Sequence, residues 1–274
     1  MTDLIVPDAE YDNDKRASRR MIAHPQSVRA VFFDVGFTLL APHPSVEDIV
    51  SQACEEAGIL VGRDCVWRHI ATAETHMRAM VRAAPQTWAD EQAIRAVWTA
   101  YFTELLRTCV ASSADGTLED AVSAALRRFD HYASYALYPD AVPVLRALHA
   151  EGLTMGVISD WGVSLWPILH AHGLNQYFDF AVISAALRYA KPHPHLFEMA
   201  LKRANAIPDY TIHVGDSYVL DVLGARSMGI QGVLIDRPGK VDPAHVDVPV
   251  IRDLYGLLDL LEVERTDIDA LGGG

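Results

Sequence analysis

The chain has 274 residues, half of them hydrophobic, and a formal net charge of −13. This size and composition allow one large domain, or one domain with an insertion, around a sizeable core. The acidic balance argues against nucleic-acid binding, and no apolar run is long enough to cross a membrane.

Residues 1–27 are polar and charged, and we expect them to form a flexible N-terminal extension. They lack the apolar stretch of a secretion signal. The three cysteines, Cys54, Cys65 and Cys109, are odd in number and have no metal-ligand spacing. We therefore expect a protein of the reducing cytoplasm, without disulfides, in which the cysteines are small, buried or half-buried side chains.

Short, nearly continuous apolar runs predict strands that are covered on both faces, as in a parallel sheet. These runs are Arg29–Asp34, Thr154–Ser159, Phe180–Ile183, Thr211–Val214 and Gly232–Ile235. Helical patterns lie between them, at Ala141–Glu151, Val163–His172, Pro194–Asn205 and Tyr218–Met228. The alternation predicts an α/β fold with a Rossmann-like parallel sheet, formed by residues 28–42 and 137–262.

No convincing strand pattern occurs in residues 43–136, so the sequence predicts an inserted, all-helical cap there. Its amphipathic stretches are Ser45–Ala57, Val61–Ala84, Thr87–Val110 and Leu118–Tyr135. We expect its aromatic residues to form the core of the cap rather than a ligand cage; they are Trp67, Trp88, Trp98, Tyr101 and Phe102. Residues 263–274 form a short C-terminal tail.

Polar side chains with catalytic potential follow the predicted strands. The four segments are Asp34-Val35-Gly36-Phe37-Thr38, Ser159-Asp160, Lys191-Pro192, and Gly215-Asp216-Ser217 with Asp221. Because ligands of open parallel sheets bind at the carboxyl ends of the strands, we expect these side chains to meet in one crevice. Three carboxylates there would repel one another without a cation, and hard oxygen ligands favour Mg²⁺.

In their order and placement these segments resemble the four motifs of the haloacid dehalogenase-like hydrolases, and the insertion resembles the cap of subfamily I. The resemblance covers about residues 28–262. It implies a Mg²⁺-dependent phosphatase that acts on a small phosphorylated metabolite through an aspartyl-phosphate intermediate. Asp34 would be the nucleophile, and Lys191 would neutralise charge on the transferring group. The resemblance further implies that Ser159 and Lys191 hold phosphate, that Asp160 lies beside them where relatives often have asparagine, and that the Thr38 hydroxyl fixes the first loop.

For the metal, the resemblance implies ligands from Asp34 and Asp216, the backbone carbonyl of Gly36, and Asp221 directly or through water. It also implies that the cap closes over the site and sets specificity. His213, inside a predicted strand, is expected to be a core histidine with satisfied hydrogen bonds. The sequence leaves the oligomeric state open.

Gly36 departs from the family pattern, because most of its phosphatases have a second aspartate here as general acid and base. A general acid contributes ~10²–10⁴ in rate. The substrate can have a good leaving group such as an acyl phosphate, or another side chain, for instance His43 or a cap residue, can supply the proton. The protein can also have lost turnover and bind a phosphorylated ligand or a partner. A 2-haloacid dehalogenase needs no such acid either, but those relatives lack the Gly-Asp metal signature that Gly215 and Asp216 retain.

Overall fold

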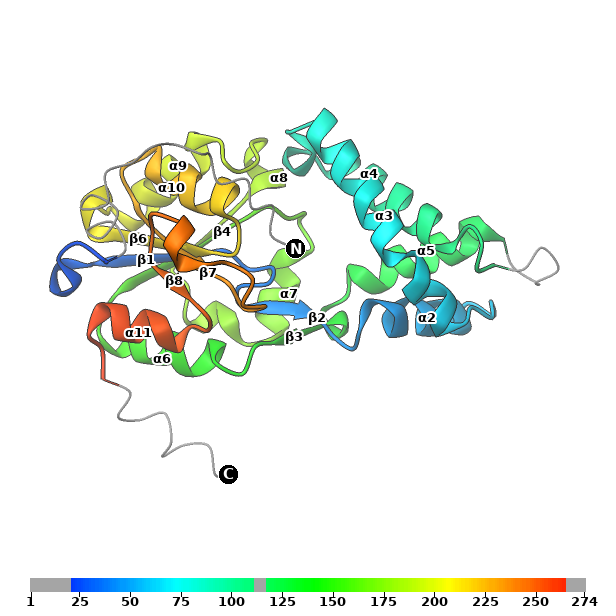
Figure 1. Cartoon of the computed structure of the whole chain (residues 1–274), viewed down its shortest axis with the longest axis horizontal. Helices are drawn as coiled ribbons and strands as arrows, with labels where there is room; N and C mark the ends of the chain where they lie inside the picture. The colour runs from blue at the N-terminus through cyan, green and yellow to red at the C-terminus, as the bar shows by residue number, and fades with distance from the viewer. Residues whose placement is uncertain (1–20, 111–116, 265–274) are drawn as a thin grey trace, which may run out of the picture.

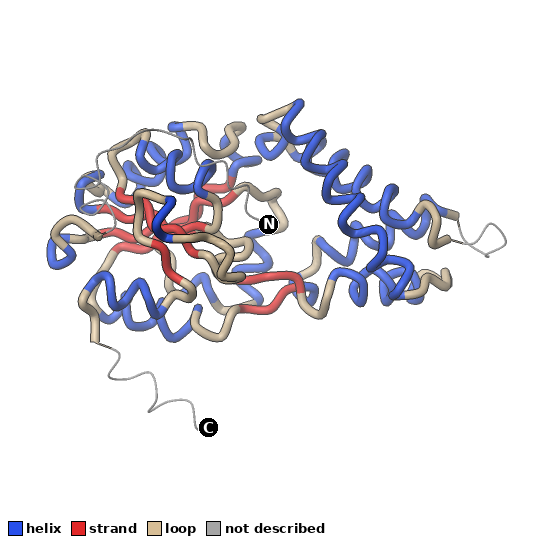
Figure 2. The backbone as a smooth tube through the Cα atoms, in the orientation of Figure 1, coloured by secondary structure: helices blue, strands red, loops and turns tan. Residues whose placement is uncertain are grey.

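The computed structural model describes residues 21–110 and 117–264. A sheet flanked by helices lies at one end of the molecule, and a bundle of longer helices lies at the other (Figures 1 and 2). Among the described helices, none is long and apolar enough to span a bilayer.

The sheet has six parallel strands in the order β5-β4-β1-β6-β7-β8, which confirms the predicted Rossmann-like class. The strands are β1 (Ala30–Phe33), β4 (Thr154–Ser159), β5 (Phe180–Ile183), β6 (Thr211–Gly215), β7 (Gln231–Ile235) and β8 (Val250–Ile251). The sequence indicated the first five, and β8 was missed because two residues show no periodicity. Strand β1 pairs with β4 on one side and β6 on the other, so its carboxyl end is the topological switch point.

Successive residues of β1 pack into different cores, which explains why the whole strand is apolar. Val31 and Phe33 belong to one hydrophobic cluster, and Ala30 and Phe32 belong to another. The first cluster includes residues of α6 (Ala141–Ala150), α7 (Leu165–Ala171) and α11 (Tyr255–Leu261). The second includes residues of α9 (Pro194–Ala204) and α10 (Gly224–Arg226). Figure 1 shows these two groups of helices on opposite faces of the sheet.

The helices predicted between residues 43 and 136 are present. They are α2 (Val46–Glu56), α3 (Arg63–Ala83), η2 (Thr87–Ala89), α4 (Glu91–Leu106) and α5 (Leu118–Phe129). Side chains at their N-termini accept hydrogen bonds from otherwise free backbone groups, including Ser45, Asp90 and Thr117. These helices bury a hydrophobic cluster of their own, with Phe102 and Leu105 at 0% exposure. The helical insertion is therefore packed as a separate unit (Figure 1).

A small antiparallel ladder joins the two parts of the molecule. Strand β2 (Leu40–Pro42) pairs with β3 (Tyr135–Leu137), where the chain enters and leaves the helical unit. The sequence did not predict this pair, because strands of three residues give too short a pattern. Short turns make up the other elements: η1 (Pro25–Ser27), η3 (Tyr132–Ser134), η4 (Leu174–Gln176), α8 (Ser184–Leu187), η5 (Pro208–Tyr210) and η7 (Pro243–His245).

The last residues of the predicted N-terminal extension are attached to the core. Ile22 is buried in the cluster around β1, and the Ala23 amide donates a hydrogen bond of 2.7 Å to the Gln231 side chain. Residues 1–20 lie outside the described part, as do residues 265–274 of the predicted tail, whereas Val263 packs against the core.

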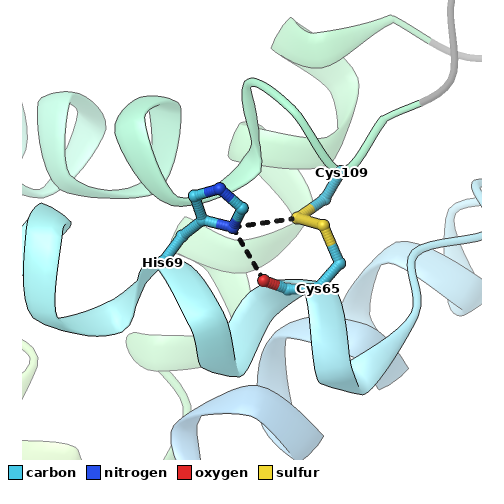
Figure 3. Close-up of side chains that lie close together, drawn as sticks. All are labelled: Cys65, His69 and Cys109. Atoms are coloured by element: carbon cyan, nitrogen blue, oxygen red, sulfur yellow. Dashed lines mark hydrogen bonds between the residues drawn. A yellow bond between two sulfur atoms is a disulfide. The ribbon is translucent and has the colours of Figure 1, made fainter.

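Two cysteines form a disulfide, so the expectation of three unbonded cysteines is wrong for Cys65 and Cys109. Cys65 lies in the first turn of α3 and Cys109 just after α4. Because α3 and α4 pack side by side, residues 44 positions apart are brought together, which local spacing does not reveal. Figure 3 shows the ring of His69 beside this bond, with Nδ1 3.8 Å from the Cys109 sulfur. Cys54 is free and buried, as expected.

Candidate active site

The predicted site residues converge at the carboxyl end of the sheet. Asp34 directly follows β1, Ser159 ends β4 and Asp216 directly follows β6. Lys191 enters from the segment between α8 and α9. Since β4, β1 and β6 are neighbours in the sheet, these side chains share one crevice, as the motif spacing indicated.

The ammonium group of Lys191 links two carboxylates in the middle of this crevice. Its Nζ lies 2.7 Å from Asp34 Oδ1 and 2.7 Å from Asp221 Oδ1. All three side chains are buried. Burial alone would lower the pKa of Lys191, but the carboxylates of Asp221, Asp34 and Asp160 raise it above the ordinary value. Lys191 therefore carries a permanent positive charge beside Asp34.

Asp34 is held in one orientation by two donors. Its Oδ1 accepts the bond from Lys191 and a hydrogen bond of 3.1 Å from Ser159 Oγ. Burial raises the pKa of Asp34, Lys191 counteracts this effect, and the nearby Asp221 adds to it. A carboxylate that is desolvated and fixed in this way is a stronger nucleophile than one in water.

Asp221 is fixed more firmly than any other acid of the crevice. Its Oδ2 accepts the Ser217 amide at 3.0 Å, and its Oδ1 accepts both Lys191 and His213 Nε2, the latter at 3.0 Å. Burial would raise the pKa of Asp221, but the Lys191 charge and the His213 hydrogen bond lower it below the ordinary value. A Cβ on Gly215 would overlap this carboxyl group, which explains the glycine.

His213 differs from the expectation of a satisfied core histidine. Its Nε2 bonds to Asp221, while its buried Nδ1 has no hydrogen-bond partner. The sequence gave no sign of this role, because the contact depends on the π-helical turn η6 (Tyr218–Leu223), which carries Asp221 back over β6. Such turns are frequent at functional sites.

The acidic side of the crevice fits a divalent cation. Carboxylate oxygens of Asp34, Asp216 and Asp221 lie within 4.8 Å of one another. Within the described residues, no group donates a hydrogen bond to the Asp216 carboxylate. Burial raises the pKa of Asp216 to about 7, and the charges of Asp34 and Asp221 add to the effect. Hard oxygen donors with unbalanced negative charge are what Mg²⁺ requires.

Of the remaining predicted residues, two lie at the crevice and one, Thr38, differs from its expected role. Gly36 and Asp160 line the cavity at the crevice, and Asp160 Oδ1 accepts the Lys191 amide at 2.9 Å. Thr38 is fully buried, and its hydroxyl makes no hydrogen bond, contrary to the expectation that it fixes the loop. Instead, the guanidinium of Arg237 holds the loop through the Thr38 carbonyl, with Nη2 at 2.6 Å. Sequence reasoning missed this arginine, which lies 199 positions further along the chain.

The crevice opens into a cavity of about 370 Å³ whose far wall belongs to the helical unit. Three of the aromatic residues that we expected in the cap core line this cavity; they are Trp88, Trp98 and Phe102. Tyr101 and Phe102 are buried as expected, and Trp67 is 64% exposed. His43 does not line the cavity, so the structure does not bring it to Asp34.

Three comparisons with known proteins agree with this architecture. The family model of the haloacid dehalogenase-like hydrolases matches residues 28–229. The haloacid dehalogenase-like hydrolase domain-containing protein 3 of Danio rerio is 30% identical over 85% of this chain and 95% of its own length. A phosphoserine phosphatase of Thermus thermophilus is 28% identical over 77% of this chain and 89% of its own. A solved phosphatase structure from Thermococcus onnurineus superposes with a TM-score of 0.59 at 25% identity, covering 87% of this chain and all of the other. The chain therefore belongs to the haloacid dehalogenase-like hydrolases.

Proposed function

We propose that this hydrolase is a Mg²⁺-dependent phosphatase of a small phosphorylated metabolite. The observation that carries the proposal is the pairing of a buried, oriented Asp34 with the Lys191 ammonium, at the floor of the cavity beside two further carboxylates. The name of the Thermus thermophilus relative supports a phosphate ester as the substrate class.

In this proposal Asp34 attacks phosphorus, an aspartyl-phosphate forms as the bond to the leaving oxygen breaks, and water then releases phosphate. Lys191 and Ser159 bind phosphate oxygens and neutralise their charge. Asp34 and Asp216, together with the Gly36 carbonyl, would hold Mg²⁺, and Asp221 would support them. The bound ion supplies charge neutralisation for the transferring phosphoryl group.

The helical unit, residues 43–136, acts in this proposal as a cap over the core formed by residues 28–42 and 137–262. The tip of the cap already touches the core: the Trp88 carbonyl accepts a hydrogen bond from Ser184 Oγ, and the Gln86 side chain accepts one from the Ala190 amide at 3.1 Å. Ser184 starts α8, just after β5. A closed cap excludes water from the reaction and supplies the contacts that choose the substrate.

The test is phosphate release from a panel of phosphate esters and acyl phosphates, with Mg²⁺ and with a chelator, by the wild type and by Asp34→Asn. We expect Mg²⁺-dependent release that Asp34→Asn abolishes. Halide release from a 2-haloacid, without phosphate release, would favour the dehalogenase alternative. Binding of phosphate without any turnover would favour a protein that only binds a phosphorylated ligand. A cytoplasmic location stays a prediction, which cell fractionation tests.

A further inference from the structure

The cap side of the cavity is built from aromatic rings. Trp88 of η2 contacts Trp98 of α4 edge to face, with ring centroids 6.2 Å apart. Trp98 is in turn stacked on Phe129, also at 6.2 Å. Tyr135, where the chain leaves the cap, meets Trp161 of the core at 5.4 Å. All five residues line the cavity. Flat, partly exposed rings on both sides of a cavity favour a flat, apolar occupant.

Several polar atoms of these walls are already hydrogen-bonded within the protein. The Tyr135 hydroxyl donates to the Phe129 carbonyl at 2.8 Å, and Trp161 Nε1 donates to Ser164 Oγ at 3.3 Å. One oxygen of Glu91 accepts the Val163 amide. A sugar or a short polyol would lose hydrogen bonds to water here and find few replacements, which costs binding free energy.

The charges in the cavity disfavour a second anionic group on the substrate. Its carboxylates away from the phosphate site are Glu91 and Asp130, and among the residues that the structure describes Lys191 is the only lysine or arginine that lines it. Lys191 lies in the phosphate site between Asp34 and Asp221, so its charge serves the phosphate and not a second anionic group. A carboxylate on the leaving group would meet like charges across the cavity.

Gly36 points independently to the same class of leaving group. Without an acid at this position, the leaving oxygen must depart with its negative charge. A phenol has a pKa of about 10, like tyrosine, whereas an alkyl alcohol has a pKa of roughly 16, close to that of water. A phenolate therefore departs far more readily without a proton than an alkoxide does.

From these observations we infer that the substrate is an aryl phosphate monoester, with its ring between the aromatic walls of the cap and Trp161. The inference rests on the proposed phosphatase function and specifies its substrate class. A bond forms between Asp34 and phosphorus while the bond from phosphorus to the aryl oxygen breaks. The electron pair leaves with the phenolate, which then takes a proton from water.

The test compares kcat/KM for phenyl phosphate and 1-naphthyl phosphate with kcat/KM for glyceraldehyde 3-phosphate and phosphoserine. The variants are Trp98→Ala and, as the matched control, Trp67→Ala, because Trp67 is exposed and does not line the cavity. We expect the wild type to prefer the aryl esters at least tenfold, and Trp98→Ala to lose most of this preference. Trp67→Ala should keep it. Because Trp98 also packs within the cap, Trp88→Ala serves as a second variant.

A binding experiment separates failure of the substrate class from failure of the proposed function. Calorimetry with Mg²⁺ compares phenylphosphonate with methylphosphonate, neither of which can lose its group by P–O cleavage. The aromatic subsite is supported if the wild type binds phenylphosphonate more tightly than methylphosphonate and Trp98→Ala weakens this binding. This holds even if no ester is hydrolysed. Equal binding of the two phosphonates, or faster hydrolysis of the polar esters, overturns the inference, and in the latter case the phosphatase itself stands.

Discussion

A Cβ at Gly36 would lie 3.6 Å from Cζ3 of Trp161, an ordinary van der Waals distance. The backbone of Gly36 is also not in the left-handed region that only glycine adopts easily. The position therefore accepts a side chain, and its glycine reflects no steric requirement of the folded chain. This makes it possible to restore the missing acid and to ask what its absence does.

Gly36→Asp should place a carboxyl group at the cavity beside Asp34, where the family's general acid stands. We expect kcat/KM for alkyl phosphates to rise about tenfold or more, because their alkoxides need a proton, and we expect little gain for aryl phosphates. Rates for a series of substituted phenyl phosphates should also depend less steeply on the pKa of the phenol. Gly36→Ala is the control, and an equal gain in that variant would show that the acid is not responsible.

The sequence predicted those parts of the fold that depend on the pattern of neighbouring residues alone. The apolar run before Asp34 could only be a buried strand, and parallel strands must bring their carboxyl ends together. The contacts of His213 and Arg237 were out of reach, because each depends on how distant segments pack. A histidine within an apolar strand has the same local pattern whether it fills a core or orients Asp221.

The cap aromatics illustrate a second limit. The sequence predicts that Trp88 and Trp98 belong to the cap core, but a cavity wall and a core give the same pattern. Cys65 and Cys109 illustrate a third limit, since their pairing follows from the packing of α3 against α4. In each of these cases tertiary packing determines the role of the residue.

Asp160 should make the stability of the metal-free protein depend on pH. Burial raises its pKa to about 7, and its Oδ2 has no hydrogen-bond partner. Between pH 4 and pH 7 the Asp160 carboxyl is therefore protonated in the folded state and ionised in the unfolded state. Because the folded state binds the extra proton, the free energy of unfolding falls as the pH rises through this range and stays low above pH 7. We expect Asp160→Asn to raise the melting temperature more at pH 8 than at pH 5, measured with a chelator present. An equal change at both values would contradict the shifted pKa.

The disulfide should contribute substantially to stability through the unfolded state. It joins residues 44 positions apart, for which loop-closure entropy corresponds to about 4 kcal/mol. We expect a reductant to lower the denaturation midpoint of the wild type and to leave the Cys65→Ser, Cys109→Ser double variant unchanged. Free Cys54 is present in both proteins and controls for other effects of the reductant. If three free thiols are counted in the denatured protein without reductant, the disulfide does not form.

Arg237 should act as a positioning residue for the loop that follows Asp34. Besides the Thr38 carbonyl, its guanidinium binds both oxygens of Asp140, at 3.0 and 3.1 Å, and lies 3.6 Å from the centre of the Tyr138 ring. A lysine at this position cannot make the paired bonds or stack in the same way. We expect Arg237→Lys to lower kcat about tenfold or more with little change in KM, because the loop would hold the nucleophile less precisely for attack.

Arg203→Lys is the matched control, since within the described part of the chain the Arg203 side chain bonds one carbonyl, that of Ala181, at an exposed site. Thermal unfolding of both variants shows whether a lower kcat comes from misplacement of the Asp34 loop or from partial unfolding of the protein. If Arg237→Lys reduces kcat only in proportion to a lower folded fraction, the arginine stabilises the core and has no separate effect on the Asp34 loop.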